Sequence, residues 1–328
     1  MNKKNPRVLY VGDKDSLHHQ RFIKLLNSNF ETRFVFTQSH IPATIHLYAP
    51  HLVICAPLQE PLQFALSYYS VPILGISWAQ EINEPRRIYE TDSEFLLALK
   101  KLSGLIVDSQ YHVNILQNLL ELNIPIKIVH FNVAPLPINP LPKFADMRLP
   151  TIISARSFEP LYRNDLILQS ASSLATEETF QLMMIGGGSQ LESMKKVYSQ
   201  TYLENRLSFT GPVSNERLLN LMSESHFYVS AARSDGISVT LLEAMHLGLI
   251  CLISDFPTNK EVISHGYNGF LFNNGDSDSF RTELKSMLNL NSAQLTSISI
   301  NARSTVQNKF SWRNSSSTFL RFINTFLA

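Results

Sequence analysis

The sequence predicts an α/β protein built of two doubly wound, Rossmann-like domains that face each other across a cleft. Three observations predict this class: apolar runs of strand length alternate with helical patterns, several of these runs are continuously apolar, and a proline-rich stretch divides the series in two. Continuous apolar runs are typical of parallel strands that are buried on both faces of a sheet. The alternation favours sheets covered by helices on both sides, which bind ligands at the carboxyl ends of their strands.

Residues 1–134 are expected to form the first domain. The strands expected in it are Arg7–Gly12, Phe34–Phe36, His51–Ala56, Pro72–Ser77, Gly104–Asp108 and Lys127–Phe131. The helices expected between them are Leu17–Asn27, Gln59–Tyr69, Ser93–Leu102 and Gln110–Leu122. This regular alternation predicts one parallel sheet.

Residues 135–150 (PLPINPLPKFADMRLP) contain five prolines and no periodicity, so they are predicted to form a semi-rigid linker. Residues 151–310 are expected to form the second domain. Its expected strands are Thr151–Ala155, Gln181–Gly186, Arg206–Thr210, His226–Ser230, Leu249–Ser254 and Gly269–Phe272. Helical pattern closes the chain from Ser292 to Phe326 with a break near Phe310–Trp312, so a last helix is expected within residues 311–328.

The composition is that of a globular protein without a strong charge bias. The chain has 328 residues, 44% of them hydrophobic, and a formal net charge of +1, which gives no electrostatic argument for nucleic acid as a partner. Cys55 and Cys251 lie in separate apolar runs and are expected to be reduced core residues. No apolar run reaches the roughly 18 residues of a membrane span, so a cytoplasmic location is expected. Peripheral contact with the inner face of the membrane is left open.

The most informative stretch is residues 230–248 (SAARSDGISVTLLEAMHLG). An apolar strand is expected to end at Ser230, and a loop with Asp235 and Gly236 follows it. A helix that carries Glu243 is then expected to run to Gly248. The two carboxylates are eight residues apart. The alternatives are a plain turn at Asp235 and a solvated helix face at Glu243.

The start of this helix offers an anion site between the two acids. Its first N–H groups, those of Ser238, Val239 and Thr240, have no partner within the helix and carry the positive end of its dipole. Such a terminus suits a phosphate. The layout therefore indicates a ligand with a diphosphate in its middle and hydroxyl-bearing sugars at both ends.

This acidic-x7-acidic pattern and its flanks resemble the retaining nucleotide-sugar glycosyltransferases of family 4 (glycosyl transferases group 1), which have the GT-B fold. The stretches LLEAMHLGLICLISDFPTNKEVISHGYNGFLF, FQLMMIGGGSQL and RLSFTGPVSNERLLNLM are similar to that family in order and spacing. The resemblance is strong over residues 151–310 and looser before them. It implies that Asp235 contacts the donor sugar, that Glu243 holds the ribose hydroxyls, and that the last helix crosses back onto the first domain. The family more often has Glu in place of Asp235, so the reach is shorter here by one methylene.

The resemblance also implies cations that stabilise the leaving diphosphate. The family usually has an Arg directly after the first strand of this domain and a Lys several residues later. In TIISARSFEPLYRND, Arg156 matches the Arg, the Lys is absent, and Arg163 is the nearest replacement. Arg and Lys are not equivalent, because the guanidinium is a planar fork that stays charged. The alternative for Arg163 is a solvated position in a first helical turn.

Two loops are implied to lie near the nucleotide. The first contains Gly187 and Gly188, whose lack of a side chain lets a ligand approach the backbone or simply permits a tight turn. The loop is not a dinucleotide fingerprint, because the pattern G-x-G-x-x-G is not completed. The second contains Gly211 and Val213 at the end of another strand, where backbone groups would hold the base. A plain loop is the alternative there.

Four residues of the first domain are implied to lie on the acceptor side. His18 and Arg21 match an H-x-x-R pattern found in part of the family, and Trp78 and Glu81 stand where many relatives have His and Asp. Because Trp78 replaces the His, an imidazole acid or base is excluded at this place. Trp78 is expected to stack on a sugar or acceptor, with a buried core position as the alternative.

No metal is expected. Two D-x-D strings occur, at residues 13–15 and 276–278. The first is interpreted as a turn at a strand end, and the second as the N-cap of a helix over Asp278–Leu288. The sequence has no Cys/His cluster with zinc spacing, no P-loop and no G-x-S-x-G motif.

The resemblance thus implies a retaining hexosyl- or N-acetylhexosaminyl-type glycosyltransferase that uses no cofactor. The donor would be a nucleoside diphosphate sugar, with UDP or GDP as the nucleotide, and the acceptor a glycan, a lipid-linked or a small molecule. The alternatives are a non-catalytic GT-B partner subunit and another GT-B enzyme such as an epimerase or a phosphorylase. The sequence does not indicate the base, the sugar, the acceptor or the oligomeric state.

Overall fold

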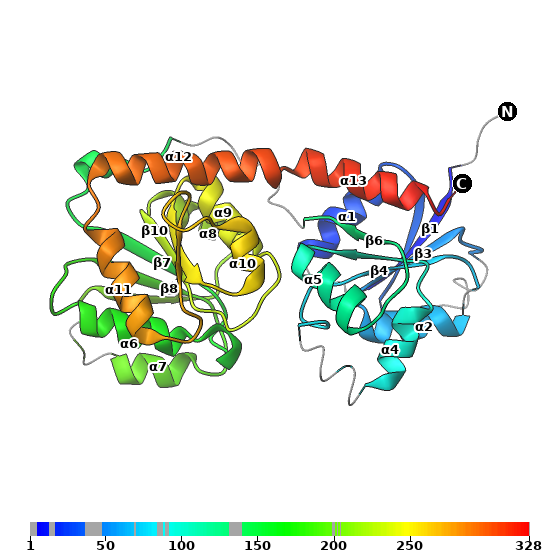
Figure 1. Cartoon of the computed structure of the whole chain (residues 1–328), viewed down its shortest axis with the longest axis horizontal. Coiled ribbons are helices and arrows are strands. Elements are labelled where there is room, and N and C mark those ends of the chain that lie inside the picture. Colours follow the sequence, from blue (N-terminus) through cyan, green and yellow to red (C-terminus); the bar gives the residue numbers. More distant parts are fainter. Residues whose placement is uncertain are drawn as a thin grey trace. The chain divides into compact units, whose positions relative to one another are not determined.

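The computed structural model describes residues 5–12, 17–36, 48–68, 70–83, 88, 92–130, 140–198, 201, 203 and 205–327 of the chain. The chain forms two compact units (Figure 1). Unit 1 consists of residues 1–131 and 313–328, and unit 2 of residues 132–312. Each unit contains a six-stranded sheet in which the described strand pairs are parallel. The predicted α/β class with two doubly wound sheets is confirmed.

The sheet of unit 1 has the strand order β2-β1-β3-β4-β5-β6. Its strands are β1 (Arg7–Gly12), β2 (Glu31–Phe36), β3 (Leu52–Ala56), β4 (Ile73–Ile76), β5 (Gly104–Val107) and β6 (Ile126–Ile128). Its helices are α1 (Leu17–Asn27), α2 (Gln59–Tyr68), α4 (Ser93–Lys100), α5 (Gln110–Asn114), which continues as a π-helix over Ile115–Leu119, and α13 (Trp312–Asn324). Strands β3, β4 and β5 are buried along their whole length, because apolar side chains fill both faces of the sheet.

Helix α13 supplies part of the core of unit 1. The ring of Phe319 lies 4.6 Å from the ring of Phe22 on α1, and both rings are buried. The rings of Phe322 and Phe326 lie against Gly104 at the start of β5, where an added Cβ would meet them at 3.1 and 2.8 Å. A glycine at this position therefore allows α13 to approach the sheet closely.

The sheet of unit 2 has the strand order β12-β11-β10-β7-β8-β9. Its strands are β7 (Thr151–Ala155), β8 (Gln181–Ile185), β9 (Leu207–Gly211), β10 (Phe227–Ser230), β11 (Ile250–Ser254) and β12 (Phe270–Phe272). Its helices are α6 (Asn164–Leu174), α7 (Leu191–Tyr198), α8 (Asn215–Ser223), α9 (Val239–Leu247), α10 (Pro257–Val262), α11 (Ser277–Leu288) and α12 (Ser292–Lys309). The chain direction across the sheet reverses between β10 and β7, which makes their carboxyl ends the topological switch point.

Helices cover both faces of this second sheet. Figure 1 shows α6, α7 and α11 on one side and α8, α9 and α10 on the other. Phe227 of β10 belongs to the core under the first group, and its neighbour Tyr228 belongs to the core under the second. Successive strand residues point to opposite faces, so β10 contributes to both cores.

Three local predictions about this architecture are confirmed. Asp276 caps α11, because its side chain accepts hydrogen bonds from the backbone N–H groups of Asp278 and Ser279. The predicted break in the last helical region separates α12 from α13. Cys55 and Cys251 are buried free thiols, and burial raises the pKa of both.

Strand β6 ends at Ile128, short of the expected Phe131, and two further segments differ from the sequence expectation. Residues 140–150, the described part of the predicted linker, lie in unit 2, and Phe144 there is only 4% exposed. Its ring lies 6.4 Å from that of Phe227, so one aromatic side chain joins this proline-rich stretch to the core. Strand β2 begins at Glu31 rather than at Phe34. The first three residues of this edge strand are polar, so the apolar run that indicated a strand begins only at Phe34.

Candidate functional site

The predicted donor-site residues of unit 2 meet at the topological switch point. Arg156 directly follows β7, and Asp235 lies in the loop between β10 and α9. Nη2 of Arg156 lies 2.5 Å from Oδ2 of Asp235, and the two side chains are 11% and 21% exposed. The fold thus brings together the cation and the first acid of the predicted site in a mostly buried ion pair.

The Arg156 guanidinium is held on three sides. Besides the ion pair with Asp235, its Nη1 donates a 2.8 Å hydrogen bond to Oγ of Ser238, and its Cζ lies 4.2 Å from the centre of the Tyr162 ring. Burial acts to lower the pKa of Arg156, but Asp235, Tyr228 and Tyr162 outweigh it and the pKa is raised. The group is therefore a fixed and permanent positive charge.

Helix α9 begins beside this charge. Ser238 is its N-cap and accepts a 3.4 Å hydrogen bond from the N–H of Leu241. Ser238, Val239 and Thr240 are only half-buried. The first N–H groups of a helix lack partners within it, so the positive end of the α9 dipole and the Arg156 guanidinium converge on one place.

The other end of α9 is fixed by α12. The helix ends at Gly248, whose φ of 87° suits the left-handed conformation of a C-cap. Arg303 of α12 donates hydrogen bonds of 2.8 Å and 3.0 Å to the carbonyls of His246 and Leu247, and Ser299 donates to the carbonyl of Gly248. A cation at this end complements the negative end of the dipole.

The loop that carries Asp235 is held by hydrogen bonds to its backbone groups. Oδ1 of Asp235 accepts a 2.9 Å hydrogen bond from the N–H of Gly236. The buried hydroxyl of Thr258 lies 3.2 Å from the carbonyl of Asp235 and 3.4 Å from that of Gly236. Both carboxylate oxygens of Asp235 are therefore engaged, one by Arg156 and the other by the loop, although each oxygen keeps a further acceptor site.

Glu243 lies in the middle of α9 and is 2% exposed. This burial excludes the solvated helix face that was the alternative for it. A carboxylate removed from water is costly unless it is bonded or paired. Glu243 lies on the second turn of α9, about one turn after the helix start. Its contact with a ribose remains a proposal.

Arg163 has a different partner from Arg156. It occupies the left-handed conformation, with φ of 46°, immediately before α6. Its Nη1 donates a 2.7 Å hydrogen bond to Oδ1 of Asn274, and an added Cβ on Gly275 would lie 2.7 Å from the same nitrogen. The guanidinium is thus directed toward the loop between β12 and α11.

The glycine loop after β8 is shaped mainly by packing. Gly186 and Gly188 have φ of 140° and 147°. An added Cβ on Gly188 would lie 2.6 Å from the carbonyl oxygen of Phe158, and one on Gly186 would collide with that of Arg156. These two glycines let the loop pack against the segment after β7, which agrees with the tight-turn interpretation. Gly187 is less confined, since Pro212, its nearest neighbour, would be 3.7 Å from a Cβ.

The second predicted nucleotide loop is more open. Gly211 ends β9 with φ of 71°, and no atom lies within 4 Å of an added Cβ. Its carbonyl accepts a 3.1 Å hydrogen bond from the N–H of Gly186, so the two loops are joined. Val213 packs partly against the core under α8 and α9.

In unit 1, Glu81 is turned into the protein. Its carboxylate accepts hydrogen bonds from the N–H groups of Leu58 (3.2 Å) and Trp78 (3.1 Å) and from Oγ of Ser77 (3.1 Å). Burial raises the pKa of Glu81, and these hydrogen bonds oppose the rise. The carboxylate therefore organises the backbone after β3 and β4, a role for which its position in the sequence gave no signal.

The other acceptor-side predictions concern Trp78, His18 and Arg21. Trp78 is half-buried, and its ring centre lies 6.2 Å from that of Phe22. The side chain is thus partly packed and partly accessible, and its stacking on a sugar or acceptor remains a prediction. His18 and Arg21 lie on α1, but their side chains are outside the described part of the structure.

Sequence reasoning missed three residues that shape the site. Tyr162 stacks on Arg156, and Thr258 supports the Asp235 loop. Oε1 of Glu159 accepts a 2.8 Å hydrogen bond from the N–H of Ser189, which ties the glycine loop to the segment after β7. No motif marks these contacts, because they join segments distant in sequence. Ser238, which was predicted, differs from them because serine is a preferred N-cap residue and so gave a local signal.

The described residues contain neither a candidate metal site nor a candidate membrane span. Among them, no three His, Cys, Asp or Glu side chains gather in a way that would hold a metal ion. The D-x-D string at residues 13–15 lies outside the described part, and Asp276 of the other string is used as the cap of α11. No helix within the described ranges is long and apolar enough to cross a bilayer.

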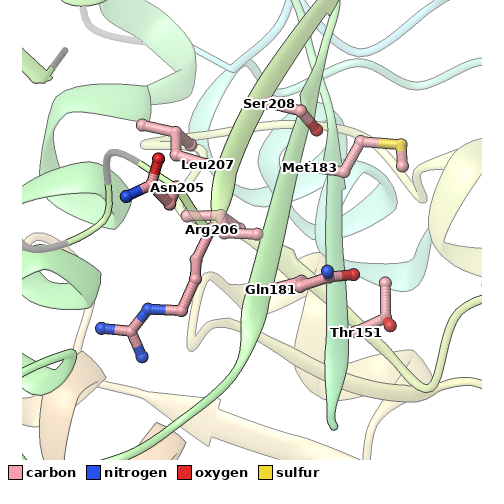
Figure 2. Close-up of a pocket in the computed structure, with 8 residues that line it drawn as sticks. Thr151, Gln181, Met183, Asn205, Arg206, Leu207 and Ser208 are labelled. Carbon is pink, nitrogen blue, oxygen red and sulfur yellow. The ribbon is translucent and has the colours of Figure 1, made fainter.

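A hollow lies at the edge of the unit 2 sheet where the strands begin, opposite the edge that carries Arg156 and Asp235 (Figure 2). Its volume is about 150 Å³, and it is lined at the amino ends of β7, β8 and β9 by residues that include Thr151 and Gln181. Figure 2 shows Arg206 extending away from Gln181. The guanidinium of Arg206 donates to the carbonyls of Ala175 and Glu178 at 2.9 and 3.1 Å, which is a structural role.

Comparison with known proteins links this geometry to a family. The model of the family described as glycosyl transferases group 1 matches residues 142–305. An uncharacterized glycosyltransferase of Methanocaldococcus jannaschii is 29% identical over 140 residues, which are 42% of this chain and 35% of that protein. N-acetyl-alpha-D-glucosaminyl L-malate synthase of Bacillus anthracis is 29% identical over 125 residues, which are 38% of this chain and 32% of that protein. The matched stretch thus spans about a third of the length of these curated relatives.

The solved structures extend the likeness to the whole fold. The structure of HepE of Anabaena in complex with UDP-glucose has a TM-score of 0.77 at 14% identity, and the match covers 97% of this chain and 99% of that one. Sucrose-phosphate synthase of Thermosynechococcus elongatus has a TM-score of 0.78 at 13% identity, with 98% of each chain covered. Identities this low establish similarity of fold, and the fold they share with this chain is GT-B.

Proposed function

Because the chain belongs to the glycosyl transferases group 1 family, we propose that it moves a sugar from a nucleoside diphosphate sugar to an acceptor. The observation that carries the proposal is the hydrogen bond of Arg156 to Ser238, the N-cap of α9. It places a fixed guanidinium beside the first N–H groups of the helix, and both favour a diphosphate. HepE of Anabaena, whose structure was solved in complex with UDP-glucose, supports a donor of this class.

In this proposal each part of the donor meets one part of the site. Arg156 and the N–H groups of Ser238, Val239 and Thr240 bind the diphosphate. The sugar lies against Asp235 and the ribose against Glu243. The base lies near the joined loops that contain Gly187, Gly188, Gly211 and Val213, through backbone groups that do not select one base. UDP is the first nucleotide to test, and GDP the second.

The proposed reaction is a transfer with retention of configuration, as in glycosyltransferase family 4. The bond between the anomeric carbon and the diphosphate oxygen breaks, and the acceptor oxygen bonds to that carbon on the same face. The acceptor proton passes to the leaving diphosphate. Arg156 and the α9 dipole stabilise the charge that develops on this leaving group, so the protein contributes positioning and electrostatics. NMR of the product's anomeric proton tests retention, because an inverted product excludes it.

The acceptor side belongs to unit 1 in this proposal, with Trp78 as the candidate stacking surface and with His18, Arg21 and Glu81 nearby in the family pattern. The acceptor is a glycan, a lipid-linked molecule or a small molecule, and the enzyme acts in the cytoplasm, with contact to the inner face of the membrane left open. The type of sugar is a hexose or an N-acetylhexosamine. The Bacillus anthracis relative, N-acetyl-alpha-D-glucosaminyl L-malate synthase, supports trying a small acceptor first.

A second candidate function is a non-catalytic partner subunit with the same fold. One observation favours it: Arg156 is already neutralised by Asp235, and Asp235 is also bonded to Gly236. A diphosphate would then compete with an internal carboxylate for the guanidinium. This candidate predicts nucleotide binding without transfer, whereas the main proposal predicts both.

The decisive experiment measures nucleotide binding and transfer separately. Thermal unfolding of the full chain is followed with UDP, GDP, ADP and their sugars, and a ligand at 100 times its Kd adds about 2.7 kcal/mol to the free energy of unfolding. Release of the diphosphate from each sugar donor is then measured with the purified chain. Stabilisation with release supports the enzyme, and stabilisation without release favours the partner subunit. No stabilisation by any diphosphate would reject the site.

A further inference from the structure

The hydroxyl of Tyr228 lies directly beneath the donor site and is fully buried. Tyr228 is on β10 and pairs with Ile153 of β7 and Cys251 of β11, in the middle of the sheet. Its side chain is 0% exposed, and its hydroxyl makes no direct hydrogen bond of standard geometry within the described residues. A buried hydroxyl without a hydrogen bond costs about 1–3 kcal/mol. Buried polar groups without a hydrogen bond are rare in native structures, so this one requires an explanation.

Tyr228 helps to line a small cavity whose walls also include donor-site residues. The polar lining is formed by Tyr228, Ser230, Asp235, Ser238 and Asn259, and the volume is about 10 Å³. One water molecule needs roughly 10–15 Å³ and two to four polar partners. The cavity therefore matches a single water and is far too small for a sugar or a phosphate.

The electrostatics of Tyr228 also connect it with the ion pair. Burial raises its pKa, and the Arg156 guanidinium acts in the opposite direction, so the hydroxyl lies within electrostatic reach of Arg156. A weak hydrogen-bonding interaction with the side chain of Ser230 also lowers this pKa, but its geometry falls short of a standard hydrogen bond. Asp235, with one oxygen on Arg156 and the other on Gly236, keeps acceptor sites free for a third donor.

We propose that Tyr228 is a positioning residue of the donor site, which acts through one water held in this cavity. The tyrosine hydroxyl donates to the water, and the water donates to the Asp235 carboxylate and to a serine hydroxyl of the lining. This chain of bonds fixes the carboxylate from below while Arg156 fixes it from the side. The proposal rests on the proposed function, because the position of Asp235 matters most when it holds a donor sugar.

Loss of this support should affect the transition state more than nucleotide binding. Arg156 and the α9 N–H groups would still bind a diphosphate, whereas Asp235 would be free to turn away from the sugar. Tyr228→Phe removes only the hydroxyl and keeps the ring, so the core stays filled. We expect kcat to fall about tenfold while the Kd for UDP stays within about twofold, because only interactions formed in the transition state change kcat.

Tyr10→Phe is the matched control. Tyr10 is equally buried on β1 of unit 1, so its substitution removes a buried phenol hydroxyl from a central strand without touching the donor site. We expect kcat and the UDP Kd of this variant to equal those of the wild type. If Tyr228→Phe lowers only the melting temperature, as any buried polar loss does, and leaves kcat unchanged, Tyr228 is merely structural and the proposal is wrong.

A crystal structure provides the readout that does not depend on activity. Wild-type crystals at high resolution should show one ordered water within hydrogen-bond distance of the Tyr228 hydroxyl and of Asp235. Tyr228→Phe crystals should lack it and should show Asp235 in a changed rotamer. A dry cavity in the wild type, or an unchanged Asp235 in the variant, overturns the proposal. If the wild type transfers no sugar at all, the proposed function fails, yet these crystals still decide whether Tyr228 positions Asp235.

Discussion

The carboxyl edges of the two sheets carry polar clusters that are built in opposite ways. In unit 1, Asp108 follows β5, and its carboxylate lies 2.8 Å from Nδ1 of His112, whose Nε2 lies 2.8 Å from Oδ1 of Asn83. Asp108 and His112 are 3% and 0% exposed. These groups satisfy one another inside the protein. In unit 2, Arg156 and Asp235 are also paired, but Asp235 is 21% exposed and the N–H groups at the start of α9 remain available.

This difference shows what separates a structural cluster from a candidate binding site. A paired carboxylate occurs at both edges, so pairing alone is not informative. The unit 2 edge differs because it combines a cation, Arg156, with the start of a helix, whose first N–H groups have no partners within the helix. The comparison predicts that substitutions at the two edges will have different readouts, activity in unit 2 and stability in unit 1.

Arg156→Ala should give the largest effect. Removal of a cation that stabilises the leaving group lowers kcat about 10²–10³-fold, by analogy with the loss of one oxyanion-hole donor. Steady-state kinetics with the preferred donor measure this fall. Arg217→Ala, which removes an exposed Arg from α8 in the same unit, is the control and should retain wild-type kcat. Equal activity of the two variants would remove Arg156 from the mechanism.

His112→Ala should act on stability alone. It leaves Asp108 and Asn83 without their partner and opens a cavity in a fully buried place, which costs about 2–4 kcal/mol of unfolding free energy. Urea denaturation measures this loss, and UDP affinity should be unchanged at a temperature where the variant is folded. A variant that keeps its stability but loses transfer would place the unit 1 cluster in the active site and break the comparison.

Glu243→Ala should weaken nucleotide binding. Two charge-assisted hydrogen bonds to ribose hydroxyls, at about 1.5–3 kcal/mol each, would be lost, although water recovers part of this energy. Isothermal titration should therefore show the Kd for UDP rising by at least tenfold. Binding of inorganic diphosphate, which has no ribose, serves as the control and should change little. If both ligands weaken equally, Glu243 supports the fold of α9 and does not contact the ribose.

Arg163→Ala should have the smallest effect. Its guanidinium is bonded to Asn274, so we expect kcat to remain within about threefold of the wild type, as for an exposed position. Asn274→Ala should give a similar result, because it releases the same contact. A loss of transfer in Arg163→Ala comparable to that in Arg156→Ala would show that Arg163 turns toward the diphosphate when the donor binds and replaces the missing lysine.

The sequence was sufficient to predict nearly all of the sheet architecture. Buried parallel strands such as β3 and β11 are continuous apolar runs, and those runs are visible without any structure. Strand β2 was seen only in part, because Glu31–Arg33 are polar on an edge strand. The proline-rich stretch was expected to be a linker, because its five prolines indicate one. The single Phe144 that packs into the core gives no recognisable pattern in the sequence.

The candidate site was predictable only where it follows a local pattern. The helix start at Ser238 and the two acids lie within one short stretch, so spacing revealed them. The ion pair of Arg156 with Asp235 joins residues that are 79 positions apart, and only the order of strands in the sheet brings them together. The stacking of Tyr162 depends on a 3-10 turn at Pro160–Tyr162, and no residue pattern specifies which way that ring turns.

The contacts of α9 with α12 have a mechanical consequence. Arg156 holds one end of α9 through Ser238, and Arg303 of α12 holds the other end through two carbonyls. Helix α9 is therefore held by side chains at both of its ends. Only Phe310 and Ser311 separate α12 from α13, which is part of unit 1. A displacement of α12 would thus act on α9, whose first turn forms the proposed diphosphate site.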